Sequence, residues 1–122
     1  MSTPSEVRRG EQLALPEWGP YFKSINRLLR EGTLLEATIS VAADEAGGTE
    51  AEGLPLASIT HEDGDAQIAI GLGGRGPRFP AVLWHFVDQP RQVWVDPLGD
   101  LPHVISIQSE SGALTRVEVH PE

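Results

Sequence analysis

Apolar side chains follow a helical period in one segment near the start of the chain. In residues 15–32, LPEWGPYFKSINRLLREG, the large apolar residues on one face are Trp18, Phe22, Ile25, Leu28 and Leu29. Their spacing of mostly three or four positions is typical of an amphipathic helix. Pro16 or Pro20 fits the first turn, and Gly32 offers the left-handed residue that ends many helices. We therefore expect a helix that packs against a sheet.

Apolar and polar residues alternate along most of the remaining chain, as in β-strands. Clear examples of the alternation are Leu35, Ala37, Ile39 and Val41, and later Ala66, Ile68, Ile70 and Leu72. Seven strands are expected, at residues 33–42, 52–60, 66–72, 81–88, 91–96, 103–109 and 113–119. Pro55 places its strand at a sheet edge or a bulge, and residues 43–50 read as an acidic, glycine-rich loop. Short connections favour antiparallel pairing of neighbours.

These elements predict an α+β fold. The amphipathic helix packs on a curved antiparallel sheet, or on a partly open barrel of about seven short strands. A chain of 122 residues suits one domain, which we assign to residues 15–122. Residues 1–14 are polar and without period, so we expect a flexible N-terminal arm.

Composition narrows the classes of function. Eighteen acidic and nine basic residues give a formal charge of −9, which argues against binding nucleic acid or an anionic membrane surface. The absence of cysteine excludes disulfide frameworks, zinc–cysteine sites and thiol catalysis. The sequence shows neither a signal peptide nor an apolar run long enough to cross a bilayer. We expect a cytoplasmic protein without a cofactor.

One glycine motif resembles a dinucleotide-binding fingerprint. Gly71, Gly73 and Gly76 match G-x-G-x-x-G after a predicted strand. That motif works because a helix begins at its last glycine, and Pro77 and Pro80 prevent a helix there. No two of the four histidines have the local spacing of a zinc site, and no serine lies in a nucleophile elbow. Catalytic and metal-binding residues are therefore not assigned.

The segments around Trp84 and Trp94 are the most informative part of the sequence. A turn at Gln89–Pro90 predicts that residues 81–88 and 91–96 form a hairpin. With an even loop length, its core face holds Val82, Trp84, Phe86, Val93 and Val95. The opposite face holds Leu83, His85, Val87, Gln92, Trp94 and Asp96. Solvated faces of antiparallel sheets are normally polar, so this second face must be covered. An odd loop length would move Trp94 to the other face.

Two kinds of cover are compatible with that pattern. The helix could pack there through Trp18, Phe22 and Ile25, or a protein partner could bind there. In the second interpretation Trp94 is the anchor and His85 a polar neighbour. The candidate interaction or pocket surface consists of Leu83, Trp84, His85, Val87 and Trp94.

The chain also resembles a family of small bacterial domains of unknown function, over residues 15–119. The similar pieces are Trp18 and Phe22 in the helix, AEGLPL at residues 51–56, Pro90 with Val93 and Val95, and Ser111–Gly112. The glycine-rich segment 73–80 departs from the family pattern. The resemblance implies the helix-and-sheet architecture and a bacterial cytosolic setting, and it implies no catalytic residue.

Three functions remain open at this point. The first is a non-catalytic binding or protein-interaction module that self-associates into a homo-oligomer. The second is a small-molecule or enzymatic pocket between helix and sheet, lined by Trp84, His85 and Trp94. The third is an acidic inhibitor of a basic partner. The acidic residues expected to cluster, because they flank the same strand, are Glu45, Glu50, Glu52, Glu62, Asp63 and Asp65.

Overall fold

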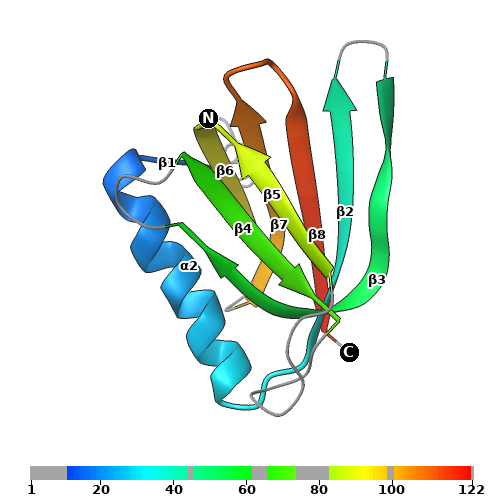
Figure 1. Ribbon diagram of the computed structural model, residues 1–122. Helices are drawn as coiled ribbons and strands as arrows, with labels where there is room; N and C mark the ends of the chain where they lie inside the picture. Colours follow the sequence, from blue (N-terminus) through cyan, green and yellow to red (C-terminus); the bar gives the residue numbers. More distant parts are fainter. Residues whose placement is uncertain (1–10, 44–45, 62–65, 74–82, 99–100, 122) are drawn as a thin grey trace, which may run out of the picture.

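The described part of the chain forms one helix and eight antiparallel strands (Figure 1). The computed structural model describes residues 11–43, 46–61, 66–73, 83–98 and 101–121. The elements are β1 (Glu11–Leu13), α2 (Leu15–Arg30), β2 (Leu35–Ala43), β3 (Ala46–Thr60), β4 (Gln67–Leu72), β5 (Leu83–Asp88), β6 (Pro90–Leu98), β7 (Leu101–Ser109) and β8 (Leu114–Pro121). The strand order is β1-β6-β7-β8-β2-β3-β4-β5, so the sheet is open, with β1 and β5 at its two ends. The predicted α+β class is confirmed, with eight strands instead of seven.

Helix α2 begins and ends where the sequence predicts. The Glu17 carboxylate accepts a hydrogen bond from the Ala14 N–H at 2.8 Å, and Pro16 lies in the first turn. At the C-terminus the Thr33 N–H donates to the Leu28 carbonyl, and the Gly32 N–H donates to the Leu29 carbonyl. These two bonds close a Schellman motif around Gly32, whose φ of +102° suits glycine.

The apolar face of α2 is buried against β3. Trp18, Phe22 and Ile25 are at most 3% exposed and belong to one core cluster with residues of β2 to β8. In Figure 1 the helix runs along one side of the sheet. Of all the strands, α2 contacts β3 most extensively. The helix therefore serves as one wall of the core.

Two segments expected to be irregular are in strands. Residues 11–13, assigned to the flexible arm, form β1 and pair with β6. Residues 43–50, assigned to a loop, lie largely in the β2–β3 pair, because β2 runs to Ala43 and β3 starts at Ala46. Neither segment shows the apolar alternation that predicts a strand, because one is polar and the other glycine-rich. Backbone hydrogen bonds between strands can form there with little side-chain burial. Residues 1–10 lie outside the described residues.

Strand β3 is shared between two halves of the sheet. Its residues up to Pro55 pair with β2, and those from Leu56 onwards pair with β4. Gly53 at φ +63° and register shifts on both sides mark bulges between the halves. The Gly53 N–H donates to the Thr38 hydroxyl at 3.0 Å. Pro55 therefore lies near a bulge in an interior strand, which is one of the two predicted positions.

The predicted hairpin of residues 81–88 and 91–96 is wrong. Among the described strands, β5 pairs only with β4, whereas β6 pairs with β1 and β7 in the other half of the sheet. Gln89, at φ +50°, forms the corner between them. Its N–H donates to the Ala66 carbonyl at 2.7 Å, and its carbonyl accepts from the Glu110 N–H at 2.8 Å. The chain thus leaves one half of the sheet and enters the other within one residue.

The alternation predicted for most strands is confirmed by burial. Leu35, Ala37 and Ile39 in β2 are at most 1% exposed, as are Ile68, Ile70 and Leu72 in β4. At the ends of the two predicted sets the alternation fails, because Val41 is only half-buried and Ala66 is exposed. Val93 and Val95 in β6 also face the core. The assignment of Trp84 and Phe86 to that same core face is wrong, because they are 47% and 51% exposed. In β5 the buried residue is Val87 instead.

Candidate functional site

The terminal strand β5 carries a group of exposed apolar side chains. Leu83, Trp84 and Phe86 are 40%, 47% and 51% exposed. The Trp84 and Phe86 rings stack with centroids 6.3 Å apart and an interplanar angle of 17°. Alternation along the strand puts both rings on the outer side, while Val87 reaches the core. We call Leu83, Trp84 and Phe86, with the backbone edge beside them, the β5 edge.

The backbone of β5 presents hydrogen-bonding groups to that open side. Gln89 bonds to Ala66, and hydrogen-bonded pairs alternate along an antiparallel ladder. Leu83, His85 and Val87 therefore direct their N–H and C=O groups to β4. The groups of Trp84 and Phe86 point away from it. Within the described ranges, no strand pairs with this side of β5. Such an edge is a template for an additional strand.

The structure brings together only part of the predicted surface. Leu83 and Trp84 lie on the β5 edge, with His85 half-buried between them and Val87, which is 3% exposed. Trp94 lies on β6, in the other half of the sheet. Its neighbours across the strands are Gln12 and Ser106.

Because β5 and β6 pair with different strands, the predicted two-sided apolar ribbon does not form. Trp94 is half-buried beside these polar neighbours, and its role as an anchor stays a prediction. Sequence reasoning missed Phe86, because both alternating sets of β5 residues are apolar and neither identifies the core side.

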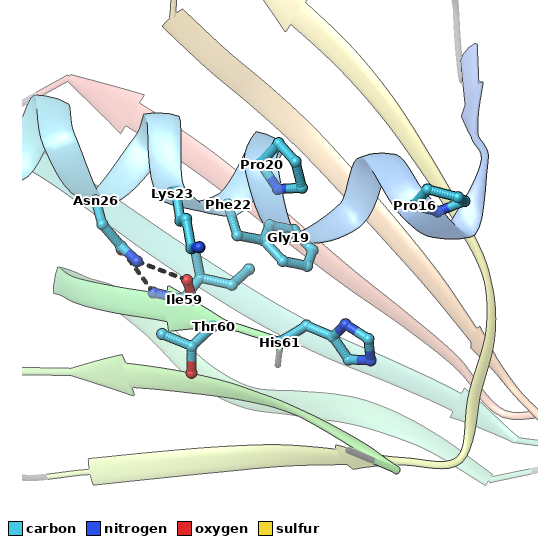
Figure 2. Close-up of a pocket in the computed structure, with 9 residues that line it drawn as sticks. All are labelled: Pro16, Gly19, Pro20, Phe22, Lys23, Asn26, Ile59, Thr60 and His61. Carbon is cyan, nitrogen blue, oxygen red and sulfur yellow. Dashed lines mark hydrogen bonds between the residues drawn. The ribbon is translucent and has the colours of Figure 1, made fainter. Parts of the chain in front are cut away.

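A pocket lies between α2 and β3, as Figure 2 shows. Its volume is about 530 Å³, and it is lined by Pro16, Gly19, Pro20, Phe22, Lys23, Asn26, Ile59, Thr60 and His61. It lies between helix and sheet, as the second hypothesis required, but Trp84, His85 and Trp94 are not among the lining residues. His61, expected in a solvent-facing turn, is half-buried, and its ring meets Trp18 edge-on at 5.2 Å.

Asn26 fixes the helix beside this pocket. Its side-chain amide donates to the Ile59 carbonyl at 2.9 Å and accepts from the Ile59 N–H at 3.0 Å (Figure 2). Ile59 lies in the part of β3 that pairs with β4, beyond the last pairing with β2. The amide therefore takes the place of a neighbouring strand. A single asparagine on a helix gives no signal of this role in the sequence.

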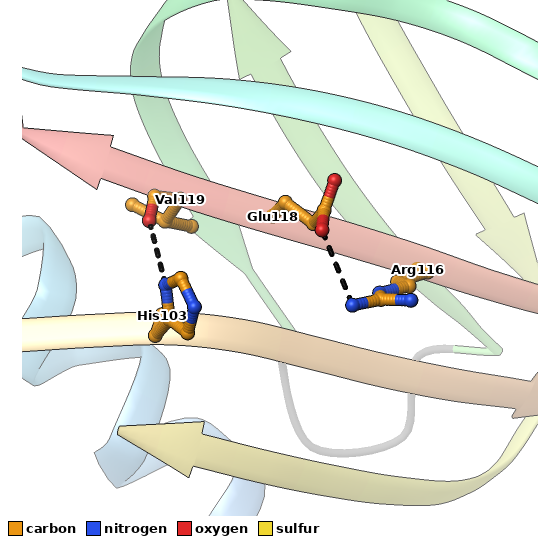
Figure 3. A network of polar contacts seen from close by, with 4 residues as sticks. All are labelled: His103, Arg116, Glu118 and Val119. Atoms are coloured by element: carbon orange, nitrogen blue, oxygen red, sulfur yellow. Dashed lines mark hydrogen bonds and ion pairs between the residues drawn. The ribbon is translucent and has the colours of Figure 1, made fainter. Parts of the chain in front are cut away.

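Polar residues on β7 and β8 form local contacts without a metal-binding arrangement (Figure 3). The His103 Nδ1 lies 3.4 Å from the Val119 carbonyl, and the His103 and His120 rings are 5.8 Å apart. Arg116 pairs with Glu118 at 3.2 Å. Among the residues with described positions, no three histidine or acidic side chains gather where they could hold a metal ion.

One ionisable side chain in the described structure has a clearly displaced pKa. Burial against the core raises the pKa of Tyr21 to about 12, because an apolar environment disfavours the phenolate. The ring also meets Phe22 edge-on at 5.9 Å. Tyr21 therefore acts as a neutral packing residue.

The acidic surface of the third hypothesis is described only in part. Glu50 and Glu52 are exposed on β3. Glu45, Glu62, Asp63 and Asp65 lie outside the described residues. In the described chain, α2 is too short and too polar to cross a membrane.

Comparisons with known protein families, with curated proteins and with solved structures find no match. The resemblance to small bacterial domains therefore stays a prediction. The functional interpretation depends on the site geometry alone.

Proposed function

We propose that this protein is a non-catalytic interaction module that self-associates by adding a strand at the β5 edge. One observation carries the proposal: Trp84 and Phe86 are stacked and about half exposed on a terminal strand. Monomeric proteins usually protect such edges with charge, proline or a covering element. Exposed aromatic groups beside unpaired backbone are typical of binding surfaces.

The size of the exposed group predicts a weak association. If each ring loses about 100 Å² of accessible apolar surface, burial contributes roughly 2.5 kcal/mol per ring. Four rings from two copies then contribute about 10 kcal/mol, and strand hydrogen bonds add a few more. The loss of translational and rotational freedom costs about 4–15 kcal/mol. A dissociation constant in the micromolar range or weaker follows.

Sedimentation over a range of protein concentrations tests this proposal. The wild-type chain should shift from monomer towards dimer as concentration rises. Trp84→Lys and Phe86→Lys should each move that shift to at least tenfold higher concentration, because a lysine on an edge strand opposes pairing.

Leu34→Lys is the matched control, since Leu34 is 52% exposed and lies outside β5. It should leave the equilibrium unchanged. Wild-type protein that stays monomeric at every concentration, or lysine variants that associate like wild type, would refute the proposal.

The pocket between α2 and β3 supports a second function, the binding of a small anion. Lys23 supplies a cationic side chain and Thr60 a hydroxyl donor at a cavity of about 530 Å³. A titration with inorganic phosphate, followed by NMR, should shift the amides of Gly19, Thr60 and His61 in a saturable way. Lys23→Gln should abolish saturation. Shifts that never saturate in wild type would exclude this function.

A further inference from the structure

The β5 edge matches a second copy of itself in both backbone and side chains. We infer that two copies pair their β5 strands antiparallel about a twofold axis at His85, so that Trp84 of one copy lies opposite Phe86 of the other. This inference rests on the proposed function. It adds the identity of the incoming strand and its register.

Symmetry leaves few registers. A twofold axis perpendicular to the sheet keeps the outer face of both copies on the same side, so outward residues must lie opposite outward residues. Trp84 and Phe86 point outward, and Val87 points inward. Even-numbered residues therefore pair with even-numbered residues. The axis can then pass Trp84, His85 or Phe86.

Side-chain chemistry selects the register centred on His85. An axis at Phe86 would put the Asp88 carboxylate, and not an aromatic ring, opposite the Trp84 indole. That carboxylate already accepts a hydrogen bond from the Gln67 side-chain amide of its own chain, at 2.6 Å. An axis at Trp84 would place only the two Trp84 rings opposite each other, because Phe86 would then face residue 82, which lies outside the described residues. The axis at His85 places all four rings side by side.

The backbone pattern agrees with the same register. Trp84 and Phe86 direct their N–H and C=O groups to the side of β5 where no described strand pairs, because Leu83, His85 and Val87 direct theirs to β4. With the axis at His85, Trp84 and Phe86 of the two copies face each other as hydrogen-bonded pairs. His85 then forms the non-hydrogen-bonded pair on the axis, where Cα atoms lie about 4.5 Å apart.

Charge favours this part of the surface for contact between two copies. Each chain carries a formal charge of −9, so two copies repel each other over most orientations. Residues 83–87, LWHFV, contain neither an acidic residue nor a lysine or arginine. The β5 edge is thus a place where two acidic chains can approach closely. Added salt should strengthen the dimer, because it screens the remaining repulsion.

Single-cysteine variants test the register directly, since the natural chain has no cysteine. His85→Cys should form a disulfide between two copies, because a Cα separation of about 4.5 Å lies within disulfide range. Trp84→Cys and Phe86→Cys should not, because each thiol then lies diagonal to its copy at a Cα distance of about 8 Å. Leu34→Cys controls for random collision.

The expected result is oxidation of His85→Cys to dimer at least about tenfold faster than that of Leu34→Cys, owing to its higher effective concentration. Faster cross-linking at position 84 or 86 than at 85 would overturn the register. So would His85→Cys that dimerises no faster than the control while wild type still self-associates through β5. Wild type that never associates would instead refute the proposed function itself. Circular dichroism should confirm that each variant is folded.

Discussion

The two hydrogen bonds between Asn26 and Ile59 make a quantitative prediction about how the helix holds the sheet. Asn26→Ala removes the donor to the Ile59 carbonyl and the acceptor for the Ile59 N–H, at 2.9 and 3.0 Å. Ile59 is 1% exposed, so its backbone groups have lost most of their water. The variant should therefore lower the free energy of unfolding while the core side chains stay in place.

The magnitude follows from the number of groups left without a partner. A buried donor or acceptor that loses its partner costs about 1–3 kcal/mol. Because Asn26 and Ile59 also line the open pocket, water can reach the freed groups, which favours the lower end of that range. We expect a loss of about 2 kcal/mol, equivalent to a fall in Tm of roughly 8 °C for a domain of this size. Alanine is a better helix former than asparagine by about 0.6 kcal/mol, so the measured loss is a lower bound on what the two hydrogen bonds contribute to the free energy of unfolding.

Asn26→Asp gives a sharper form of this test. An ionised aspartate accepts from the Ile59 N–H but repels its carbonyl, whereas the protonated acid can donate to that carbonyl. The pKa of the new carboxyl should thus be higher in the folded than in the unfolded chain, where it is about 3.9. Its stabilising contribution is then full below the unfolded pKa and is lost as pH rises through the folded pKa.

Urea unfolding of wild type, Asn26→Ala, Asn26→Asp and Lys23→Ala at pH 7 and pH 4 provides the measurement. Lys23→Ala, an exposed change on the same helix, should stay within about 0.5 kcal/mol of wild type. A loss below about 0.5 kcal/mol for Asn26→Ala would show that water replaces the amide without cost. If the free energy of unfolding of Asn26→Asp falls as far below that of wild type at pH 4 as at pH 7, donation from residue 26 to the Ile59 carbonyl is contradicted.

Three further predictions concern other residues. Because burial raises the pKa of Tyr21 to about 12, a pH titration followed by the ultraviolet absorbance of this single tyrosine should show ionisation at a pH well above that at which free tyrosine ionises. Stability should fall from about pH 10 upward, where the unfolded chain ionises first, and Tyr21→Phe should remove that part of the fall. Gln89→Gly should keep or raise the free energy of unfolding by up to about 1 kcal/mol in urea melts, whereas Gln89→Val should lower it by about 2 kcal/mol, because φ is +50°. Trp18→Phe removes the indole N–H bond to the Leu13 carbonyl at 3.1 Å, and hydrogen exchange should then accelerate at residues 11–13 but not in β7. Equal exchange in both would argue against that bond as the anchor of β1.

Local patterns in the chain were sufficient for the helix and for most strands. A period of 3.6 residues identifies Trp18, Phe22 and Ile25 as the buried face of the helix. Gly32 marks the end of the helix, because glycine adopts a positive φ without strain. Leu35, Ala37 and Ile39 in β2 likewise show their core side by alternation with polar residues. Each of these features depends on neighbours within a few positions.

Only the tertiary structure decided which strand β5 pairs with and which of its faces is exposed to solvent. Trp84 and Phe86 are as apolar as Leu83 and Val87, so alternation cannot identify the core side of this strand. Burial of Val87 depends on pairing with β4, and Gln89 directs the chain away to β6 with no glycine to mark the turn. Strand partners far apart in sequence are chosen by the packing of the whole core, which a local pattern does not encode.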